Sequence, residues 1–153
     1  MPLGRWVVRA ALAAGAAASS SGVVPAGAAA QGARVVVVVN SANPLASLPR
    51  EQVSRMFLKK LTRWPDGAPV QPADLAIDAP VRAQFTDAVL GKSVSTVRAY
   101  WNARIFTGRD VPPPEKGSEG EVLAFVSANA GAIGYVSPNA ALPPSVRALV
   151  VTE

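Results

Sequence analysis

Few side chains in this sequence are able to do chemistry, and their pattern excludes most kinds of active site. The 153 residues include no histidine and no cysteine, so the commonest general base and metal ligand and any thiol nucleophile are missing. The aspartates are scattered and form no D-x-D-x-D-G calcium loop. They are Asp66, Asp74, Asp78, Asp87 and Asp110. We therefore expect no catalytic residue, no metal site and no cofactor.

One segment resembles the end of a nucleotide-binding P-loop. Gly91, Lys92 and Ser93 match the last three residues of that motif. The complete motif also needs a glycine five residues before the Gly-Lys pair, where this chain has Thr86. The motif must follow a strand, whereas the residues before Gly91 have the spacing of a helix. We interpret Gly91 as a helix terminator and expect no ATP site.

The first 30 residues have the composition of a secretory signal peptide. Arg5 and Arg9 give a basic start, residues 10–18 form an apolar, alanine-rich stretch, and residues 28–30 are alanines. Serines at 19–21 interrupt the apolar stretch before it reaches the roughly 20 residues that a membrane-spanning helix needs. We expect cleavage near residue 30, no stable membrane insertion afterwards, and a periplasmic or secreted location.

Residues 31–153 are then the mature chain, which has a suitable length for a single domain. Loss of Arg5 and Arg9 lowers the net charge from +5 to +3. No basic run is longer than Lys59 and Lys60, and none alternates with aromatic residues. We therefore expect no nucleic-acid partner.

Four short segments have the pattern of strands. Residues 34–39, five valines after Arg34, and residues 132–136 have the continuous apolar pattern of strands that are buried on both faces. Residues 70–75 contain Pro72, which predicts a strand at the edge of a sheet. Residues 146–151 are the fourth predicted strand.

Four helices are expected between these strands. Ser47 and Asp78 are predicted to cap the first and second, and Ser93 begins the third. Ser118 and Glu121 form a capping box for the fourth. The third helix is predicted to bury Val94, Val97, Trp101 and Ile105. The order of strands and helices predicts an α/β domain with a mixed sheet.

Three segments together resemble the phosphate-binding proteins of ABC transporters. These are residues 48–67 (LPREQVSRMFLKKLTRWPDG), residues 85–87 (FTD) and residues 129–136 (NAGAIGYV). Their order and spacing extend over most of the mature chain. The resemblance implies a single periplasmic-binding-protein type 2-like domain over residues 31–153, with a mixed sheet flanked by helices.

The resemblance also implies where an anion would bind. In that family the site includes an arginine and a Ser-Gly-Thr sequence at a helix N-terminus, where free N–H groups favour negative charge. Here Leu75 and residues 79–81 (APV) stand at those positions. The remaining polar candidates for ligand contact lie on predicted loops or helix starts near strand ends. They are Asn40, Ser41, Asn43, Arg82 and Thr107.

Two functions follow as hypotheses. The first is a solute-binding protein that delivers phosphate or another oxyanion to an ABC permease. The second is a periplasmic protein-interaction or sensory module that keeps the fold without a small ligand and binds another envelope protein. For the second, the expected contact regions are the proline-rich loop 111–114 and the corner at Arg63 and Trp64. The chain supplies material for about one lobe of a two-lobed binding protein.

Overall fold

A five-stranded mixed sheet organises the chain. The computed structural model describes residues 35–153, and the predicted signal segment lies outside this part. The strand order is β2-β7-β1-β6-β3. Central β1 runs antiparallel to β6 and to β7, β2 is parallel to β7, and β3 is parallel to β6. The strands are β1 (Val36–Asn40), β2 (Ser47–Pro49), β3 (Gln71–Pro72), β6 (Ala132–Val136) and β7 (Val146–Thr152).

The two most apolar strands lie at the middle of this sheet, as the sequence predicted. All five residues of β6 are buried, and in β1 only Val36 is partly exposed. A strand buried on both faces needs apolar residues at every position, which explains why neither strand alternates with polar residues. The edge position predicted from Pro72 is confirmed by β3, but the single strand predicted over residues 70–75 is wrong, because only Gln71 and Pro72 pair with the main sheet.

A separate short strand pair extends the structure beyond β3. β4 (Asp74–Leu75) pairs in parallel with β5 (Glu115–Lys116). Ala73, between β3 and β4, is fully buried and donates its N–H to the carbonyl of Ile133 in β6. The chain thus leaves the main sheet at Pro72 and brings Asp74 and Leu75 towards α2.

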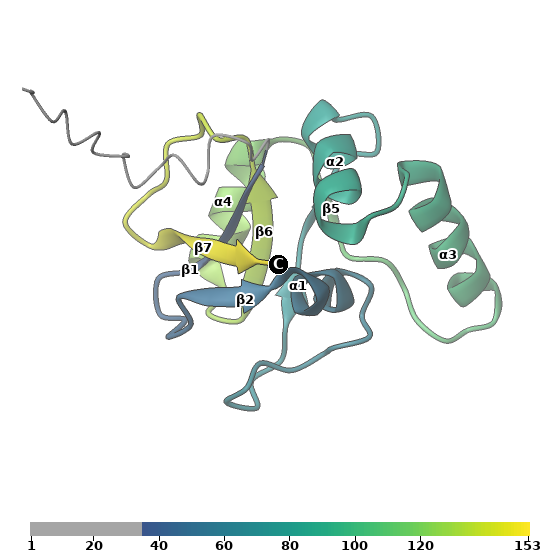
Figure 1. Cartoon of the computed structure of the whole chain (residues 1–153), viewed down its shortest axis with the longest axis horizontal. Coiled ribbons are helices and arrows are strands. Elements are labelled where there is room, and N and C mark those ends of the chain that lie inside the picture. Colours follow the sequence, from purple (N-terminus) through teal and green to yellow (C-terminus); the bar gives the residue numbers. More distant parts are fainter. Residues whose placement is uncertain (1–34) are drawn as a thin grey trace, which may run out of the picture.

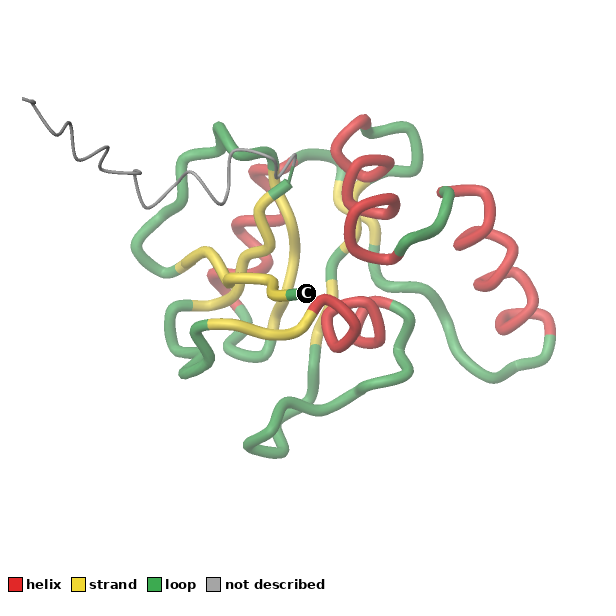
Figure 2. Tube along the Cα trace, viewed as in Figure 1, coloured by secondary structure: helices red, strands yellow, loops and turns green. Residues whose placement is uncertain are grey.

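Five helical segments lie beside the sheets in the described part of the chain, residues 35–153 (Figures 1 and 2). α4 packs on β6 and β1, α1 contacts β2, and α3 lies furthest from the sheet. α2 continues directly into a five-residue π-helical segment, η2, which ends at Gly91 with a φ of 63°. The segments are α1 (Arg50–Phe57), α2 (Pro80–Phe85), η2 (Thr86–Leu90), α3 (Val94–Phe106) and α4 (Glu119–Ala128).

The predicted helix starts are confirmed for two helices and wrong for two. The Ser93 and Ser118 hydroxyls accept hydrogen bonds from the backbone of Thr96 and Glu121, as capping predicts. Ser47 instead lies in β2, where it is paired with Val150 of β7, and α1 begins after Pro49 without a side-chain cap. α2 begins after Ala79, also without a side-chain cap, so Asp78 does not cap it.

An aromatic cluster joins α1, α2 and β6 at the centre of the core. The Phe85 and Tyr135 rings stack with centroids 3.9 Å apart, and Phe57 lies 4.6 Å from Phe85. Stacked aromatic pairs contribute about 0.5–1.5 kcal/mol beyond the burial of their surface. This cluster fixes where the α2 segment lies against β6.

A smaller cluster of Leu58, Val97 and Trp101 holds α3. The predicted apolar stripe of this helix is confirmed for Val97 and Trp101. It is wrong for Val94, which is only partly buried, and for Ile105, which is 49% exposed. The end of α3 therefore presents apolar surface to solvent.

Substitution of Gly134 tests the packing of α4 on β6. A Cβ atom at Gly134 would lie 2.6 Å from Cγ1 of Val122, which is fully buried. We expect Gly134→Ala to lower the free energy of unfolding by about 1–3 kcal/mol, because overpacked cores are strained by this amount. Chemical denaturation measures the loss.

Gly120 in the first turn of α4 provides the matched control. A Cβ there would meet Ser118 Oγ at an ordinary 3.7 Å. Gly120→Ala should leave stability unchanged or raise it by up to about 1 kcal/mol, the helix propensity difference. Equal effects of both substitutions would contradict this account of the α4–β6 contact.

Candidate functional site

The start of α2 is the position at which the resemblance places an anion, and it offers few donors. Pro80 is the first residue of the helix and has no N–H. The N–H of Ala79 already bonds to the carbonyl of Ala76, and that of Arg82 bonds to Ala79. Asp78 is exposed just before the helix, where its negative charge opposes an anion.

Arg82 is the only cation of the predicted set, and its charge is already neutralised. Its side chain is buried, and Nη1 donates to the Leu75 carbonyl at 2.8 Å and to Glu115 Oε1 at 2.6 Å. Nη2 lies 3.4 Å from Asp74 Oδ2. A guanidinium that faces two carboxylates and a carbonyl has little positive potential left for a ligand.

Tyr135 completes this group, which we call the buried charge cluster (Asp74, Arg82, Glu115 and Tyr135). Its hydroxyl donates to Asp74 Oδ1 and accepts the N–H of Leu75 at 3.1 Å. Burial raises the pKa of Asp74, although Arg82 and the Tyr135 hydroxyl oppose the rise. Burial and the negative Asp74 raise the pKa of Tyr135, so its phenol stays protonated and donates.

Asn40 and Ser41 lie at the opposite end of the sheet from Arg82. The reason is strand direction, since β1 is antiparallel to β6 and β3 is parallel to β6. The amide of Asn40 is buried and donates to the carbonyls of Val126 at 2.9 Å and Ser127 at 3.1 Å. Asn40 thus satisfies carbonyls in the last turn of α4, which have no partner within a helix.

Asn43 lies at the same end of the sheet as Asn40, whereas Thr107 is distant from it in the fold. Asn43 is buried, and its Oδ1 accepts the N–H of Leu45 at 2.9 Å. Thr107 follows α3, is exposed, and donates its hydroxyl to the Ala103 carbonyl at 2.9 Å. The five candidate residues thus occupy three places, and their contact with a ligand stays a prediction.

A basic groove between α1 and η2 was not predicted from the sequence. It has a volume of about 670 Å³ and includes Arg55, Lys60 and Lys92, which have no ion-pair partner among residues 35–153. Arg50, at its margin, pairs with Glu153 at 3.3 Å. Leu58 and Leu90 supply apolar wall.

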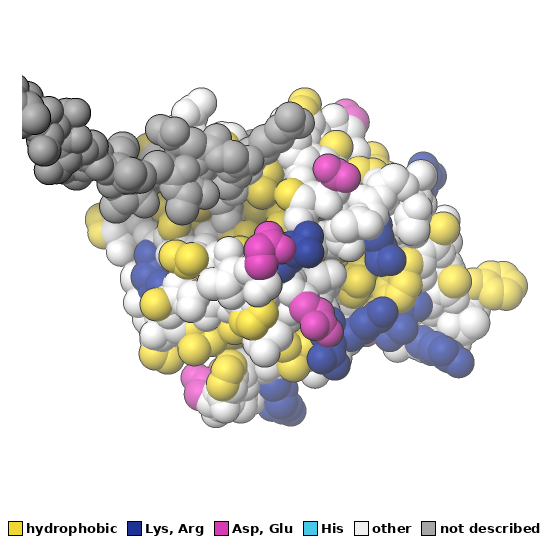
Figure 3. All heavy atoms as spheres, viewed as in Figure 1, with side chains coloured by type: hydrophobic (Ala, Val, Ile, Leu, Met, Phe, Trp, Pro, Cys, Tyr) yellow, Lys and Arg dark blue, Asp and Glu magenta, His cyan; other side chains and the backbone are white. Residues whose placement is uncertain are grey.

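The sequence contained one signal for this groove. Between Asp87 and Asp110 the chain has four basic residues and no acidic one. Figure 3 shows Lys and Arg side chains gathered over the α1 and α3 part of the visible face. Lys92 joins Arg55 and Lys60 only because the η2 segment packs on α1, and neither local composition nor spacing reveals that contact.

Comparison with known proteins adds evidence on the fold. No protein-family model and no curated protein sequence matches the chain. Solved structures do match it. An ABC-type phosphate transport receptor from Vibrio cholerae is 21% identical with a TM-score of 0.57, and the match covers 75% of this chain and 44% of the receptor.

Two further structures give the same result. One, from Clostridium perfringens, is described as a phosphate ABC transporter substrate-binding protein with bound phosphate; it is 21% identical with a TM-score of 0.61 over 76% of this chain and 44% of its own. PstS from Borrelia burgdorferi is 14% identical with a TM-score of 0.59, and the match covers 77% of this chain and 47% of PstS.

The chain has the fold of phosphate ABC transporter substrate-binding proteins. This confirms the predicted fold class, an α/β fold with a mixed sheet flanked by helices. The chain spans less than half the length of each of these neighbours. Over the residues that the structure describes, no helix is long and apolar enough to cross a membrane, and no three acidic side chains are grouped to hold a metal ion.

The buried charge cluster should make stability depend on pH through Asp74. A pKa above the usual 3.8 means that the folded state binds this proton more tightly than the unfolded chain. The stabilising contribution is complete below about pH 4 and is lost as pH rises through the native pKa. We expect the free energy of unfolding of the natural protein, relative to Asp74→Asn, to fall over the pH range above about pH 4, by at most about 1.4 kcal/mol per pH unit.

Urea denaturation across this pH range measures the effect. The Asp74→Asn side chain would keep an oxygen acceptor for the Leu75 N–H but would not titrate. Asp87→Asn is the control, because Asp87 is exposed and its removal should leave the pH profile parallel to that of the natural protein. If the stability of Asp74→Asn also changed with pH in parallel with that of the natural protein, the raised pKa of Asp74 would be contradicted.

Proposed function

We propose that the chain is an exported protein of the solute-binding type that binds phosphate or a related oxyanion for an ABC permease. The fold it shares with phosphate-binding receptors supports this function. The basic start, alanine-rich stretch and alanine exit of residues 1–30 support export to the periplasm or the medium.

The basic groove is the observation that carries the oxyanion part of this proposal. The groove is lined by three unpaired cations, Arg55, Lys60 and Lys92. Of its two acidic residues, Glu153 forms an ion pair with Arg50, so Glu51 is the one negative charge of the lining without an ion-pair partner among residues 35–153. Oxyanions are bound by such convergent cations through charge-assisted hydrogen bonds. The start of α2 is disfavoured, because Arg82 already faces Asp74 and Glu115. The proposal therefore moves the anion away from the position that the resemblance implied.

The groove is open to solvent on one side. A second copy of the chain or another envelope protein would cover it. Closure would exclude water and strengthen the contacts between the cations and the ligand.

Phosphate should stabilise the folded protein if the groove binds it. A ligand that binds only the folded state raises its stability, by about 2.7 kcal/mol at one hundred times the dissociation constant. We expect phosphate, and to a lesser extent sulfate, to raise the melting temperature. The double variant Arg55→Gln with Lys92→Gln should remove most of this rise, because it removes two of the three groove cations.

Arg98→Gln with Arg109→Gln is the matched control. Both arginines are exposed and lie outside the groove, so the double control variant loses the same net charge. It should keep the response to phosphate. The absence of any shift with millimolar phosphate, sulfate or organic phosphates would contradict the proposal, and so would equal loss in the two double variants.

A second candidate function is protein interaction, and one surface favours it. Phe106 at the end of α3 is 93% exposed, and Ile105 and Val111 are 49% and 61% exposed. A fully exposed phenylalanine beside other apolar residues is unusual on a monomer and is typical of contact surfaces. Val111 belongs to the predicted contact loop 111–114 and is exposed, whereas Trp64 of the predicted corner is buried.

A photo-crosslinking amino acid at position 106 tests this second function. We expect a crosslink to one envelope protein in cells, and the same substitution at Val150, which is 60% exposed, should give none. Phe106→Ser should leave the denaturation midpoint unchanged, because the ring buries little surface. Identical background labelling at both positions would contradict an interaction surface at α3.

A further inference from the structure

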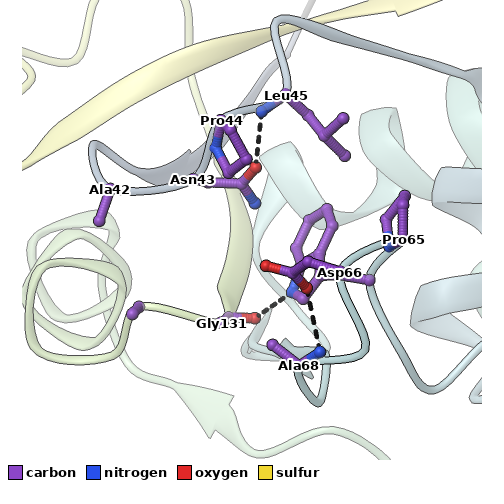
Figure 4. A pocket seen from close by; sticks show the side chains of 10 residues that line it. Ala42, Asn43, Pro44, Leu45, Pro65, Asp66, Ala68 and Gly131 are labelled. Atoms are coloured by element: carbon purple, nitrogen blue, oxygen red, sulfur yellow. Dashed lines mark hydrogen bonds between the residues drawn. The ribbon is translucent and has the colours of Figure 1, made fainter.

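A second hollow lies at the end of the sheet where β1 finishes. Three loops meet there around a cavity of about 370 Å³ (Figure 4). They contribute residues 42–45, 64–66, 68 and 130–131. The cavity shares no residue with the basic groove, and none of its lining residues is lysine or arginine. Its chemistry therefore differs from that of an oxyanion site.

The walls of this cavity are apolar and held in place. The Trp64 side chain is buried, and its Nε1–H donates to the Gly131 carbonyl at 2.9 Å. Gly131 admits no side chain, because a Cβ there would lie 2.4 Å from the Pro69 carbonyl oxygen. Pro44 and Pro65 form further wall. Tryptophan and proline side chains lose little conformational freedom when a ligand binds, so the hollow is preformed.

Asn43 presents an unused hydrogen-bond donor to the cavity. Only 7% of this residue is exposed. Its Oδ1 accepts the Leu45 N–H, and its carbonyl oxygen accepts a bond from Arg147. The amide nitrogen has no protein partner within residues 35–153, and Figure 4 shows the Asn43 amide on the side of the cavity that holds Asp66. The nitrogen is not among the buried, unpartnered side-chain atoms of the described residues but is open to the cavity, where water or a ligand can accept its hydrogen bond.

Asp66 supplies an acceptor and the only charge of the lining. One of its carboxylate oxygens, Oδ1, accepts the Ala68 N–H at 3.0 Å. The other has no partner in the part of the chain that the structure describes. The cavity thus offers one N–H donor and one negatively charged acceptor above apolar walls. An anion would meet the Asp66 charge, whereas a cation that carries its own acceptor fits both groups.

From these contacts we infer that the cavity binds a primary ammonium group that stands next to a carbonyl and an apolar side chain. The ammonium donates to Asp66, the carbonyl accepts from Asn43, and the apolar side chain packs against Pro44 and Pro65. This chemistry occurs in derivatives of apolar amino acids and at the free N-terminus of a peptide. The volume lies within the range of about 300–1,000 Å³ typical of small-ligand sites.

Titration with leucinamide tests the inference. Binding is measured as the change in the NMR chemical shift of the Trp64 indole N–H. Leucinamide has the ammonium, the carbonyl and an apolar side chain, whereas N-acetylleucinamide lacks the ammonium. At pH 6.5 we expect a saturable shift with leucinamide and at least tenfold weaker binding of N-acetylleucinamide. Binding should also weaken at pH 9.5, because an α-amino group loses its proton near pH 7.7–8.0.

Two variants distinguish the effect of the Asp66 carboxylate from the effect of removing any one negative charge. Asp66→Asn should weaken leucinamide binding at least tenfold, while Asp87→Asn, an exposed aspartate outside the cavity, should leave it within twofold. The peptide Leu-Ala-Ala distinguishes the two sources: binding as tight as leucinamide assigns the site to peptide N-termini, and much weaker binding assigns it to small amines. Equal shifts with leucinamide and its acetylated form, or no shift with either, would overturn the inference.

These outcomes are independent of the proposed oxyanion function. The phosphate response is read from the melting temperature and depends on Arg55 and Lys92, which do not line this cavity. Asp66→Asn should leave that response unchanged, and the Arg55 and Lys92 variants should leave the leucinamide shift unchanged.

Discussion

The hydrogen bond between Tyr135 and Asp74 is the contact on which most of this fold depends. Tyr135 lies in the buried strand β6 and carries its hydroxyl to the short β4–β5 pair, while its ring stacks on Phe85 of α2. Asp74 also faces Arg82, which in turn bonds to the Leu75 carbonyl and Glu115. One side chain therefore joins the main sheet, the small sheet and the α2 segment.

This constraint also decides what the start of α2 does. A buried cation is costly unless it is paired, and the two carboxylates around Arg82 provide that pairing. The same pairing removes the positive potential that an anion would need. Arg82 is therefore not available to bind a ligand. The unpaired cations line the groove between α1 and η2 instead. The basic groove and the cavity at the end of β1 consequently differ in charge: three unpaired cations line the groove, and a single carboxylate lines the cavity.

Much of the fold was predictable because its strongest signals are local. The β6 and β1 runs, the edge position of Pro72, and the serine caps of α3 and α4 each depend on a few neighbouring residues. The errors have a common physical origin in longer contacts. Ser47 has the chemistry of a cap, but pairing with β7 draws it into β2. Ile105 has helical spacing, but within residues 35–153 it is left 49% exposed at the end of α3.

The sequence by itself determined the α/β class, the central strands, the absence of histidine and cysteine chemistry, and the resemblance to phosphate-binding proteins. Only the tertiary structure decided which polar residues share a site. Asn40 and Arg82 both follow strands in the sequence, yet they lie at opposite ends of the sheet because β1 runs antiparallel to β6 while β3 runs parallel to it. Strand direction is set by hydrogen bonds between residues that are far apart in the chain, and neither composition nor spacing encodes it.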